Sequence, residues 1–280
     1  MKQLYVIGDP VAHSLSPVLH GAMLTQTGAP YRYDTRTVRS QELASFVRWA
    51  KGGGCAGFNV TMPHKEAILP LLDEADGGAA ACGAVNTVCI REGRAIGHNT
   101  DGSGLLDSLA GHGFAPQGQS VLLLGAGGAA RAVCGALAQA GAAHIFIAAR
   151  RPEQAAALAP LYAGHVTVIP FTALAMAQAA ADCRLTVNAT PLGMAGCASW
   201  RQLSFLQQLP RDAVVYDLVY HPRRTALLKE AQRLGLRTIG GIDLLIRQAV
   251  RAFTLFTGES VDTAALYAAL REPLGLAQDT

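Results

Sequence analysis

A glycine-rich segment in the middle of the chain has the residue types and spacing that bind a nucleotide pyrophosphate. The motif Gly125-x-Gly127-x-x-Ala130 directly follows the apolar run 120–124 and precedes a stretch with helical periodicity that reaches about Gln139. In this strand–turn–helix context the first glycine allows the tight turn, the second lets the backbone approach the pyrophosphate, and the small third residue lets helix and strand pack closely. A tight turn without a ligand is the alternative. We expect helix amides to meet the phosphate charge and the cofactor to contact Gly125, Ala126, Gly127, Gly128 and Ala129.

The end of the next expected strand, 144–149, indicates which dinucleotide binds. An NAD-binding protein normally carries Asp or Glu about 20 residues past the glycines, where it binds the ribose hydroxyls. This chain has Ala149, Arg150 and Arg151 there instead, and Glu153 is expected in the first turn of the following helix. Guanidinium groups suit the doubly charged 2′-phosphate. NADP is the expected cofactor, although two solvated surface arginines remain the alternative.

Polar side chains also gather in four short segments between residues 13 and 102, near expected strand ends. Ligands of open α/β sheets bind at the carboxyl ends of strands. Each segment alone has a simpler explanation: Ser14 or Ser16 could cap a helix, Asn86 could be a turn residue, and Lys65 a solvated lysine. The four segments are His13-Ser14-Leu15-Ser16-Pro17, Asn59-Val60-Thr61-Met62-Pro63-His64-Lys65, Gly83-Ala84-Val85-Asn86-Thr87 and Gly97-His98-Asn99-Thr100-Asp101-Gly102.

The elements that must position these segments alternate between apolar strand-like runs and helical periodicity, which is typical of parallel α/β architecture. In the first third we expect strands near 3–8, 31–38, 55–61 and 85–90, and helices near 16–27, 41–51 and 64–74. A helix near 101–112 ends at a glycine- and proline-containing segment. A second series follows, with strands near 120–124, 144–149, 165–169, 184–188, 213–217 and 236–239, and closing helices at 243–257 and 262–271.

This pattern predicts a two-domain α/β protein with a cleft between the domains. The substrate-binding domain is expected at 1–104, completed by the carboxy-terminal helices of 241–280. The Rossmann-type NADP-binding domain is expected at 105–240.

Taken together, the motifs resemble those of the shikimate dehydrogenase family over essentially the whole chain. Gly8-Asp9-Pro10 with 13–17 and His20 is similar to the family's amino-terminal signature, and the other three polar segments match its substrate-domain motifs in order. The glycine loop from Gly125 to Arg131 matches its nucleotide loop. Later matches are Asn188-Ala189-Thr190-Pro191-Leu192-Gly193-Met194, Tyr216-Asp217-Leu218-Val219-Tyr220 and the segment from Gly241 to Gln248.

The resemblance implies reversible reduction of 3-dehydroshikimate to shikimate with NADPH, in the shikimate pathway of aromatic amino acid biosynthesis. It makes Lys65 and Asp101 the catalytic pair. It assigns the substrate carboxylate to Ser14 and Ser16, and gives the ring hydroxyls or the carboxylate to Thr61, Asn86, Tyr220 and Gln248. It puts Leu218 and Gly241 at the nicotinamide side. Ala149 replaces the family's usual asparagine, which weakens one expected cofactor contact, and Leu244 replaces a methionine of similar volume.

The residue types suit this chemistry. Hydride transfer to a ketone builds negative charge on oxygen, so a proton donor or a cation must lie within hydrogen-bond reach. Lys65 can serve as either, and Asp101 beside it would keep the ammonium charged and positioned. The sequence leaves open whether Lys65 carries the proton or stabilises charge.

Two other functions are compatible with the motifs. The nearest is a related dehydrogenase that acts with NAD on quinate, or on both quinate and shikimate; the serines and the missing strand-end acid favour shikimate and NADP. The second is a non-catalytic nucleotide-binding regulator, which would have no chemical need for both Lys65 and Asp101.

Composition excludes several classes of protein. Half of the 280 residues are apolar and 15% are charged, which argues against disorder, and no charge-free apolar segment of about 20 residues is present. The net charge of +3 without a dense basic run disfavours nucleic acid. The six cysteines lack metal-ligand spacing, so we expect reduced thiols and no metal site. A cytoplasmic monomer or homodimer with a small-molecule substrate is expected.

Overall fold

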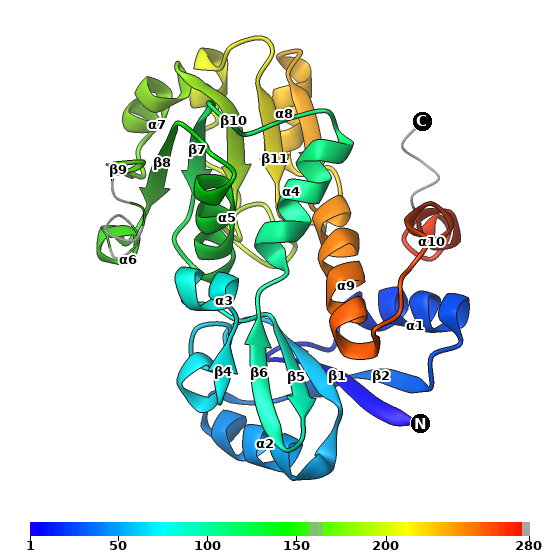
Figure 1. The fold of residues 1–280 in the computed structure, drawn as a ribbon. Helices are drawn as coiled ribbons and strands as arrows, with labels where there is room; N and C mark the ends of the chain where they lie inside the picture. Colours follow the sequence, from blue (N-terminus) through cyan, green and yellow to red (C-terminus); the bar gives the residue numbers. More distant parts are fainter. Residues whose placement is uncertain (157, 159–161, 163, 276–280) are drawn as a thin grey trace. The chain divides into compact units, whose positions relative to one another are not determined.

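The computed structural model describes residues 1–156, 158, 162 and 164–275. Contacts divide the chain into an amino-terminal unit, Met1–Thr100 with Ile246–Thr280, and a central unit, Asp101–Leu245. Each unit is built on its own sheet. Helix α9, Gly241–Thr257, begins in the central unit and ends in the amino-terminal unit (Figure 1).

The sheet of the amino-terminal unit is mixed. Its order is β2-β1-β3-β5-β6-β4, with β1 parallel to β2 and β3, and with β5 antiparallel to β3 and β6. Strands β5 and β6 form a hairpin whose turn contains Glu92 and Gly93, both with positive φ, a conformation that two-residue hairpin loops favour. The strands are β1 (Lys2–Gly8), β2 (Tyr31–Thr37), β3 (Gly57–Val60), β4 (Glu74–Ala75), β5 (Thr87–Arg91) and β6 (Arg94–His98).

Helices bury the apolar residues of this sheet on both faces. One cluster joins Ile7 and Phe58 of the sheet to Phe46 and Val47 of α2. The cluster on the other face contains Leu4 and Val6 of β1 together with Ala252 and Phe256 of α9, so the carboxy-terminal helices return to this unit. The helices are α1 (Ser16–Thr27), α2 (Leu43–Trp49), α3 (Gly77–Cys82) and α10 (Thr263–Leu270), with short helical turns at Ser40–Glu42, Ala50–Gly54 and Leu69–Leu71.

The sheet of the central unit is parallel throughout and has the order β12-β11-β10-β7-β8-β9. This is the doubly wound order of dinucleotide-binding folds, in which the strand order reverses between β7 and β10 and leaves a ligand crevice at their carboxyl ends. The strands are β7 (Ser120–Leu124), β8 (His144–Ala149), β9 (Val166–Pro170), β10 (Cys183–Asn188), β11 (Val214–Asp217) and β12 (Arg237–Gly240).

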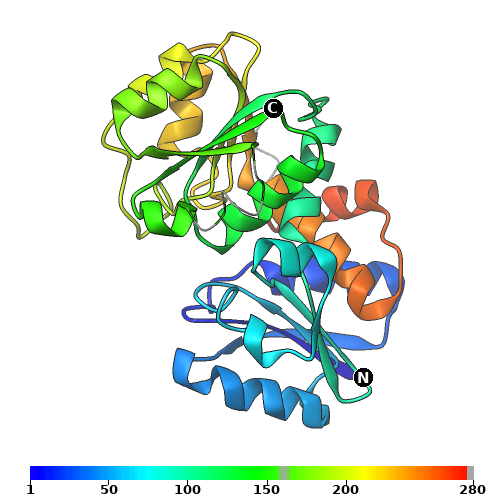
Figure 2. The same cartoon turned by 60° about the vertical axis from the view of Figure 1, so that its left-hand side comes forward.

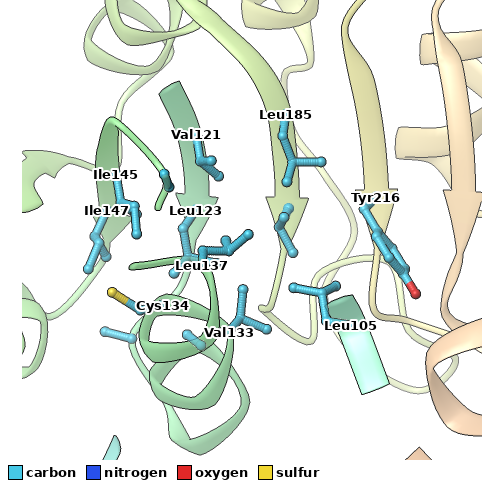
Figure 3. Close-up of a cluster of buried hydrophobic side chains, with 14 of the residues drawn as sticks. Leu105, Val121, Leu123, Val133, Cys134, Leu137, Ile145, Ile147, Leu185 and Tyr216 are labelled. Atoms are coloured by element: carbon cyan, nitrogen blue, oxygen red, sulfur yellow. The ribbon is translucent and has the colours of Figure 1, made fainter. Parts of the chain in front are cut away.

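Both faces of the parallel sheet are covered, as parallel sheets require. Helices α4 (Asp101–Gly111) and α5 (Gly128–Gln139) lie on one face, where side chains of β7, β8, β10 and β11 point toward them (Figures 1 and 3). Helices α7 (Ala173–Ala180) and α8 (Ala226–Arg233) cover the opposite face together with the turn Ser204–Gln208 (Figure 2). Helix α6 (Pro152–Ala156) follows β8 and contains Glu153 in its first turn, as expected.

The structure confirms the two-part α/β fold and most expected elements. The helix expected at 16–27 has those bounds, and every expected strand of the central unit is present. The helix expected at 64–74 is wrong: this segment contains turns, the short helical turn Leu69–Leu71 and the start of β4. Pro70 lacks an amide hydrogen and restricts the residue before it, which disfavours a continuous α-helix through this position. The expected all-parallel arrangement is also wrong for the amino-terminal unit, where β5 is antiparallel. None of the described helices is long and apolar enough to span a bilayer.

Candidate functional site

One edge of the amino-terminal sheet gathers most of the expected substrate residues. Because β5 is antiparallel to its neighbours, its amino end lies at the same edge as the carboxyl ends of β1, β3 and β6. The Thr61 amide donates to Ile7 O (2.9 Å) and the Val60 amide donates to Asn86 O (2.8 Å). The segments after β1 and β3 and the segment before β5 are therefore tied together by backbone hydrogen bonds.

Ser14 and Ser16 lie side by side where α1 begins. The Ser14 hydroxyl donates to Ser16 Oγ (3.1 Å), and the Ser16 amide donates to Ser14 Oγ (3.2 Å). These two hydrogen bonds fix the backbone where the helix begins. The pair also provides two neutral hydroxyl groups. Hydroxyls are directional donors, so the pair can bind a carboxylate.

Lys65 lies in the turn that follows β3, where its side chain is half-buried. Two neighbours hold this turn: His64 is buried with Nε2 2.6 Å from Val38 O, and the Val85 amide donates to Lys65 O (2.8 Å). A Cβ atom at Gly8 would lie 2.5 Å from Thr61 Cγ2, so glycine is needed where the end of β1 meets this turn. The turn that carries Lys65 is thus held by one backbone hydrogen bond, one side-chain contact and the close approach of Gly8.

Asn86, Thr100 and Gln248 form a hydrogen-bonded row. The Thr100 amide donates to Asn86 Oδ1 (2.8 Å), and Asn86 Nδ2 donates to Thr100 Oγ1 (3.0 Å). The Thr100 hydroxyl donates to Gln248 Oε1 (3.4 Å). Thr100 had no predicted role, yet it joins two predicted substrate residues that are far apart in the sequence.

A buried polar network behind this edge also escaped the sequence interpretation. Tyr33 donates to Asn59 Oδ1 (2.7 Å), while Asn59 Nδ2 donates to Asn86 O (3.1 Å) and Thr87 Oγ1 (2.9 Å). Burial raises the pKa of Tyr33, and a hydrogen bond with Ser16 opposes the shift. These bonds link the serine pair to the row that contains Asn86. Nothing in the sequence of β2 distinguishes Tyr33 from an ordinary strand residue, so its part in this network was not predicted.

His20 packs against the same network without a hydrogen-bond partner for its buried Nδ1. Its ring stacks on Tyr33 with centroids 3.9 Å apart and contacts Phe253 and Phe256. Burial lowers the pKa of His20 from 6.5 to about 3. The histidine is therefore neutral in the folded chain at neutral pH.

The low pKa of His20 predicts acid sensitivity of the amino-terminal unit. Below pH 6.5 His20 is protonated in the unfolded chain but stays neutral in the folded chain until about pH 3. This residue therefore lowers the free energy of unfolding as pH falls from 6.5 to about 3. Between pH 7 and 5 the loss is about 2 kcal/mol. Urea titrations followed by tryptophan fluorescence, to which Trp49 of this unit contributes, should show that His20→Leu removes this part of the pH dependence. The exposed control His165→Leu should retain it; equal slopes for all three proteins would contradict the assignment.

The central unit holds the glycine loop at the carboxyl end of β7. Gly125 has φ 113°, a conformation that favours glycine, and a Cβ atom there would also crowd Ala189 O at 3.1 Å. Gly127 precedes α5 without a side-chain cap, and Ala130 is completely buried between helix and sheet. The loop thus has the form of a phosphate cradle at a helix amino terminus.

Arg150 and Arg151 are exposed at the end of β8. A hollow of about 550 Å³ opens beside them and is lined by Ala149, Arg150, Pro152, Val168, Ile169, Pro170 and Phe171. Arg151 is not among the lining residues. Of the predicted 2′-phosphate residues, Ala149 and Arg150 therefore border a concave surface with largely apolar walls.

Leu218 and Gly241 lie together in the central unit. A Cβ atom at Gly241 would lie only 2.3 Å from Leu218 O, so a side chain at 241 would displace this turn. Tyr220, two residues farther along, is half-buried, and burial raises its pKa. The structure thus brings the two predicted nicotinamide-side residues into contact.

Asp101 is the first residue of α4 and is buried, with a relative exposure of 7%. It directly follows Thr100 of the row described above. Gly102 lets α4 approach α5 closely, since a Cβ atom there would lie 2.8 Å from Ala132 O. The Asp101-Gly102 pair therefore combines a buried carboxyl with a helix contact that only glycine permits.

Metal ligation finds no support in the described residues, where no three His, Cys, Asp or Glu side chains gather as a candidate site. All six cysteines are free; five are buried, as expected, and Cys197 is exposed.

Comparisons with known proteins identify the family. Three family profiles match in order: the shikimate dehydrogenase substrate binding domain at residues 6–88, shikimate / quinate 5-dehydrogenase at 108–224, and the shikimate 5'-dehydrogenase C-terminal domain at 241–271. A shikimate dehydrogenase (NADP(+)) of Moorella thermoacetica is 43% identical, covering 96% of this chain and 92% of the relative.

Solved structures extend the comparison to the fold. Shikimate 5-dehydrogenase of Thermus thermophilus, in complex with NADP(H) and shikimate, has a TM-score of 0.86 at 36% identity and covers 97% of this chain and 99% of its own. Quinate dehydrogenase of Corynebacterium glutamicum, in complex with NAD, has the same TM-score at 34% identity, with 97% and 99% covered.

Proposed function

Because the chain belongs to the shikimate dehydrogenase family, we propose that it catalyses the reversible, NADP-dependent oxidation of shikimate to 3-dehydroshikimate. The observation that carries this proposal is the polar sheet edge of the amino-terminal unit. There Asn86, Thr100 and Gln248 are joined by hydrogen bonds, and the Ser14–Ser16 hydroxyl pair and Lys65 belong to the same edge. This set of neutral donors and acceptors suits a small polyhydroxylated carboxylic acid.

The substrate residues have complementary roles in this proposal. Ser14 and Ser16 bind the carboxylate, because paired hydroxyls can donate to both of its oxygens. Thr61, Asn86, Gln248 and Tyr220 bind the ring hydroxyls or the carboxylate. The amide groups can both donate and accept, and therefore match hydroxyls in either orientation. The amino-terminal unit accordingly acts as the substrate domain and the central unit as the NADP domain.

Lys65 and Asp101 act at the reacting carbon. The alcohol loses a proton when shikimate is oxidised, and oxygen gains one in the reverse direction. Lys65 Nζ exchanges that proton or, as an ammonium, stabilises the negative charge on oxygen. Asp101 keeps the ammonium charged and oriented, and accepts a hydrogen bond from a ring hydroxyl.

The residues of the central unit fit NADP. When bound, NADP supplies the hydride acceptor for the reaction. Gly125, Ala126, Gly127, Gly128 and Ala129 hold the pyrophosphate at the amino terminus of α5, and the positive φ of Gly125 shapes this loop. Arg150 and Arg151 bind the 2′-phosphate beside Ala149, while Leu218 and Gly241 border the nicotinamide.

Initial rates with two substrates and two cofactors test the proposed activity. We expect the highest kcat/KM with shikimate and NADP, because the strand end carries arginines rather than an acid that would bind the ribose hydroxyls of NAD. The expected preference for NADP over NAD is roughly 100-fold, which two charge-assisted hydrogen bonds can supply. A higher kcat/KM with quinate and NAD would instead identify a quinate dehydrogenase. NADP binding without turnover of either acid would identify a regulator.

We further propose that the enzyme works in the cytoplasm as a monomer or homodimer. Six free cysteines suit a reducing compartment. Light scattering during size-exclusion chromatography distinguishes the two oligomeric states.

A further inference from the structure

Asp217, at the end of β11, is a completely buried carboxylate whose partners all donate to it. Asn188 Nδ2 and the Val219 amide donate to Oδ1 at 2.8 and 3.0 Å, and the Thr225 hydroxyl donates to Oδ2 at 2.6 Å. Asn188 and Thr225 are themselves completely buried. Burial raises the pKa of Asp217, and these hydrogen bonds oppose the shift because they favour the ionised form.

Each partner of Asp217 fixes the backbone of a different segment. Asn188 Oδ1 accepts from the Thr190 amide (3.0 Å) and hydroxyl (2.6 Å), which fixes the turn after β10. The Val219 amide fixes the turn after β11. Thr225 caps α8 by accepting from the Leu228 amide (3.3 Å). One carboxylate therefore joins three segments that are separated in the sequence.

Two of these turns border residues assigned to the cofactor. Ala189 O lies against Gly125, and Leu218 O lies against Gly241. The Leu218 amide also donates to Asn188 O (3.0 Å), which couples the two turns directly. Glycine at 125 and 241 leaves the backbone itself as the surface, so a shift of either turn changes the shape of the site.

We propose that Asp217 is a positioning residue for the nicotinamide side of the cofactor site, acting through the turns at 189–192 and 218–219. The proposal rests on the proposed function, since it takes NADP as the ligand. Asp217 does not touch the cofactor: it holds the backbone that does. Arg150, at the adenosine end of the site, follows β8, and β7 and β10 separate β8 from β11 in the sheet. Binding of the adenosine end therefore does not depend on Asp217.

The test compares Asp217→Asn with the wild type by calorimetric titration of NADP and of adenosine 2′-monophosphate. In the wild type the Thr225 hydroxyl donates to Asp217 and accepts from the Leu228 amide. An asparagine amide group at 217 would instead point its own hydrogens at the Thr225 oxygen, so the bond from Thr225 would be lost. We expect Kd for NADP to rise about tenfold, the cost of one misdirected hydrogen bond to a buried carboxylate site. Adenosine 2′-monophosphate should bind within twofold of wild type.

The control Asp212→Asn removes an exposed carboxylate that pairs with Arg184 beside β11, and it should change neither ligand's affinity. Equal weakening of NADP and adenosine 2′-monophosphate by Asp217→Asn would overturn the proposal, because it would indicate general damage to the unit. Unchanged NADP binding would also overturn it. Failure of the proposed function is seen separately, as a wild-type protein that binds neither NADP nor adenosine 2′-monophosphate.

A second pair of variants applies even where Asp217→Asn does not fold. Thr225→Ser keeps the hydroxyl that donates to Asp217 and caps α8, whereas Thr225→Val removes it. We expect the serine variant to bind NADP like wild type and the valine variant to bind it severalfold more weakly. Equal defects in both variants would show that the methyl group, and not the carboxylate network, is responsible.

Discussion

Replacing Lys65 with alanine should lower kcat for shikimate oxidation by about 10²- to 10⁴-fold, the range typical for loss of a group that transfers a proton or stabilises charge. NADP affinity should change little, because the proposed cofactor residues belong to the central unit while Lys65 belongs to the amino-terminal unit. Steady-state rates and calorimetric titration of NADP measure the two quantities independently. Near-wild-type turnover would exclude Lys65 as a catalytic residue.

Two further variants sharpen this prediction. Lys51→Ala, which removes another lysine of the same unit that pairs with Asp73 at the surface, should leave kcat unchanged. Lys65→Arg keeps the positive charge but holds its protons more tightly. Partial recovery of turnover in the arginine variant would indicate charge stabilisation, while activity as low as that of Lys65→Ala would indicate proton transfer.

Replacing Arg150 and Arg151 together with serine should raise KM for NADP by roughly 100-fold while changing KM for NAD less than twofold. A charge-assisted hydrogen bond contributes about 1.5–3 kcal/mol, so two lost contacts are sufficient. Arg150 lines the hollow and Arg151 does not, so Arg150→Ser alone should account for the larger share.

The matched control removes two exposed arginines elsewhere in the central unit, Arg201 and Arg211, by the same substitution. It lowers the net charge equally and should leave the preference for NADP intact. A preference that survives in the Arg150/Arg151 variant would contradict the cofactor assignment. Loss of preference in the control would show that overall charge, rather than the strand end, attracts the 2′-phosphate.

The glycine loop could be predicted from sequence because everything it needs is local. The buried run 120–124, the glycines and the following helix are contiguous, and the structure has them within one residue of the expected bounds. The hairpin β5–β6 was harder to predict. Its second strand, Arg94–His98, alternates poorly and ends in a polar segment, so it resembles a loop. That hairpin is what brings Asn86 and Thr100 together.

The buried polar networks could not be predicted because their members are distant in the sequence. Tyr33 and Asn59 lie on different strands, as do Asn188 and Asp217. A single Tyr, Asn or Asp on a strand shows no periodicity or spacing that would identify it as a member of a buried network. Family motifs contain Asn188 and Asp217, but a motif alone does not show that one carboxylate joins both turns. The roles assigned to individual site residues remain predictions.

The division of the chain into units has a consequence for its synthesis on the ribosome. The amino-terminal unit contains the first hundred residues, yet Ala252 and Phe256 of α9 complete one face of its sheet. Tyr31 and Arg91 also bond to carbonyls near Phe256. We therefore expect the central unit, although translated later, to finish folding first. Leu4 and Val6 then stay incompletely covered until α9 has been translated, and partly exposed apolar surface of this kind makes a nascent chain prone to aggregation.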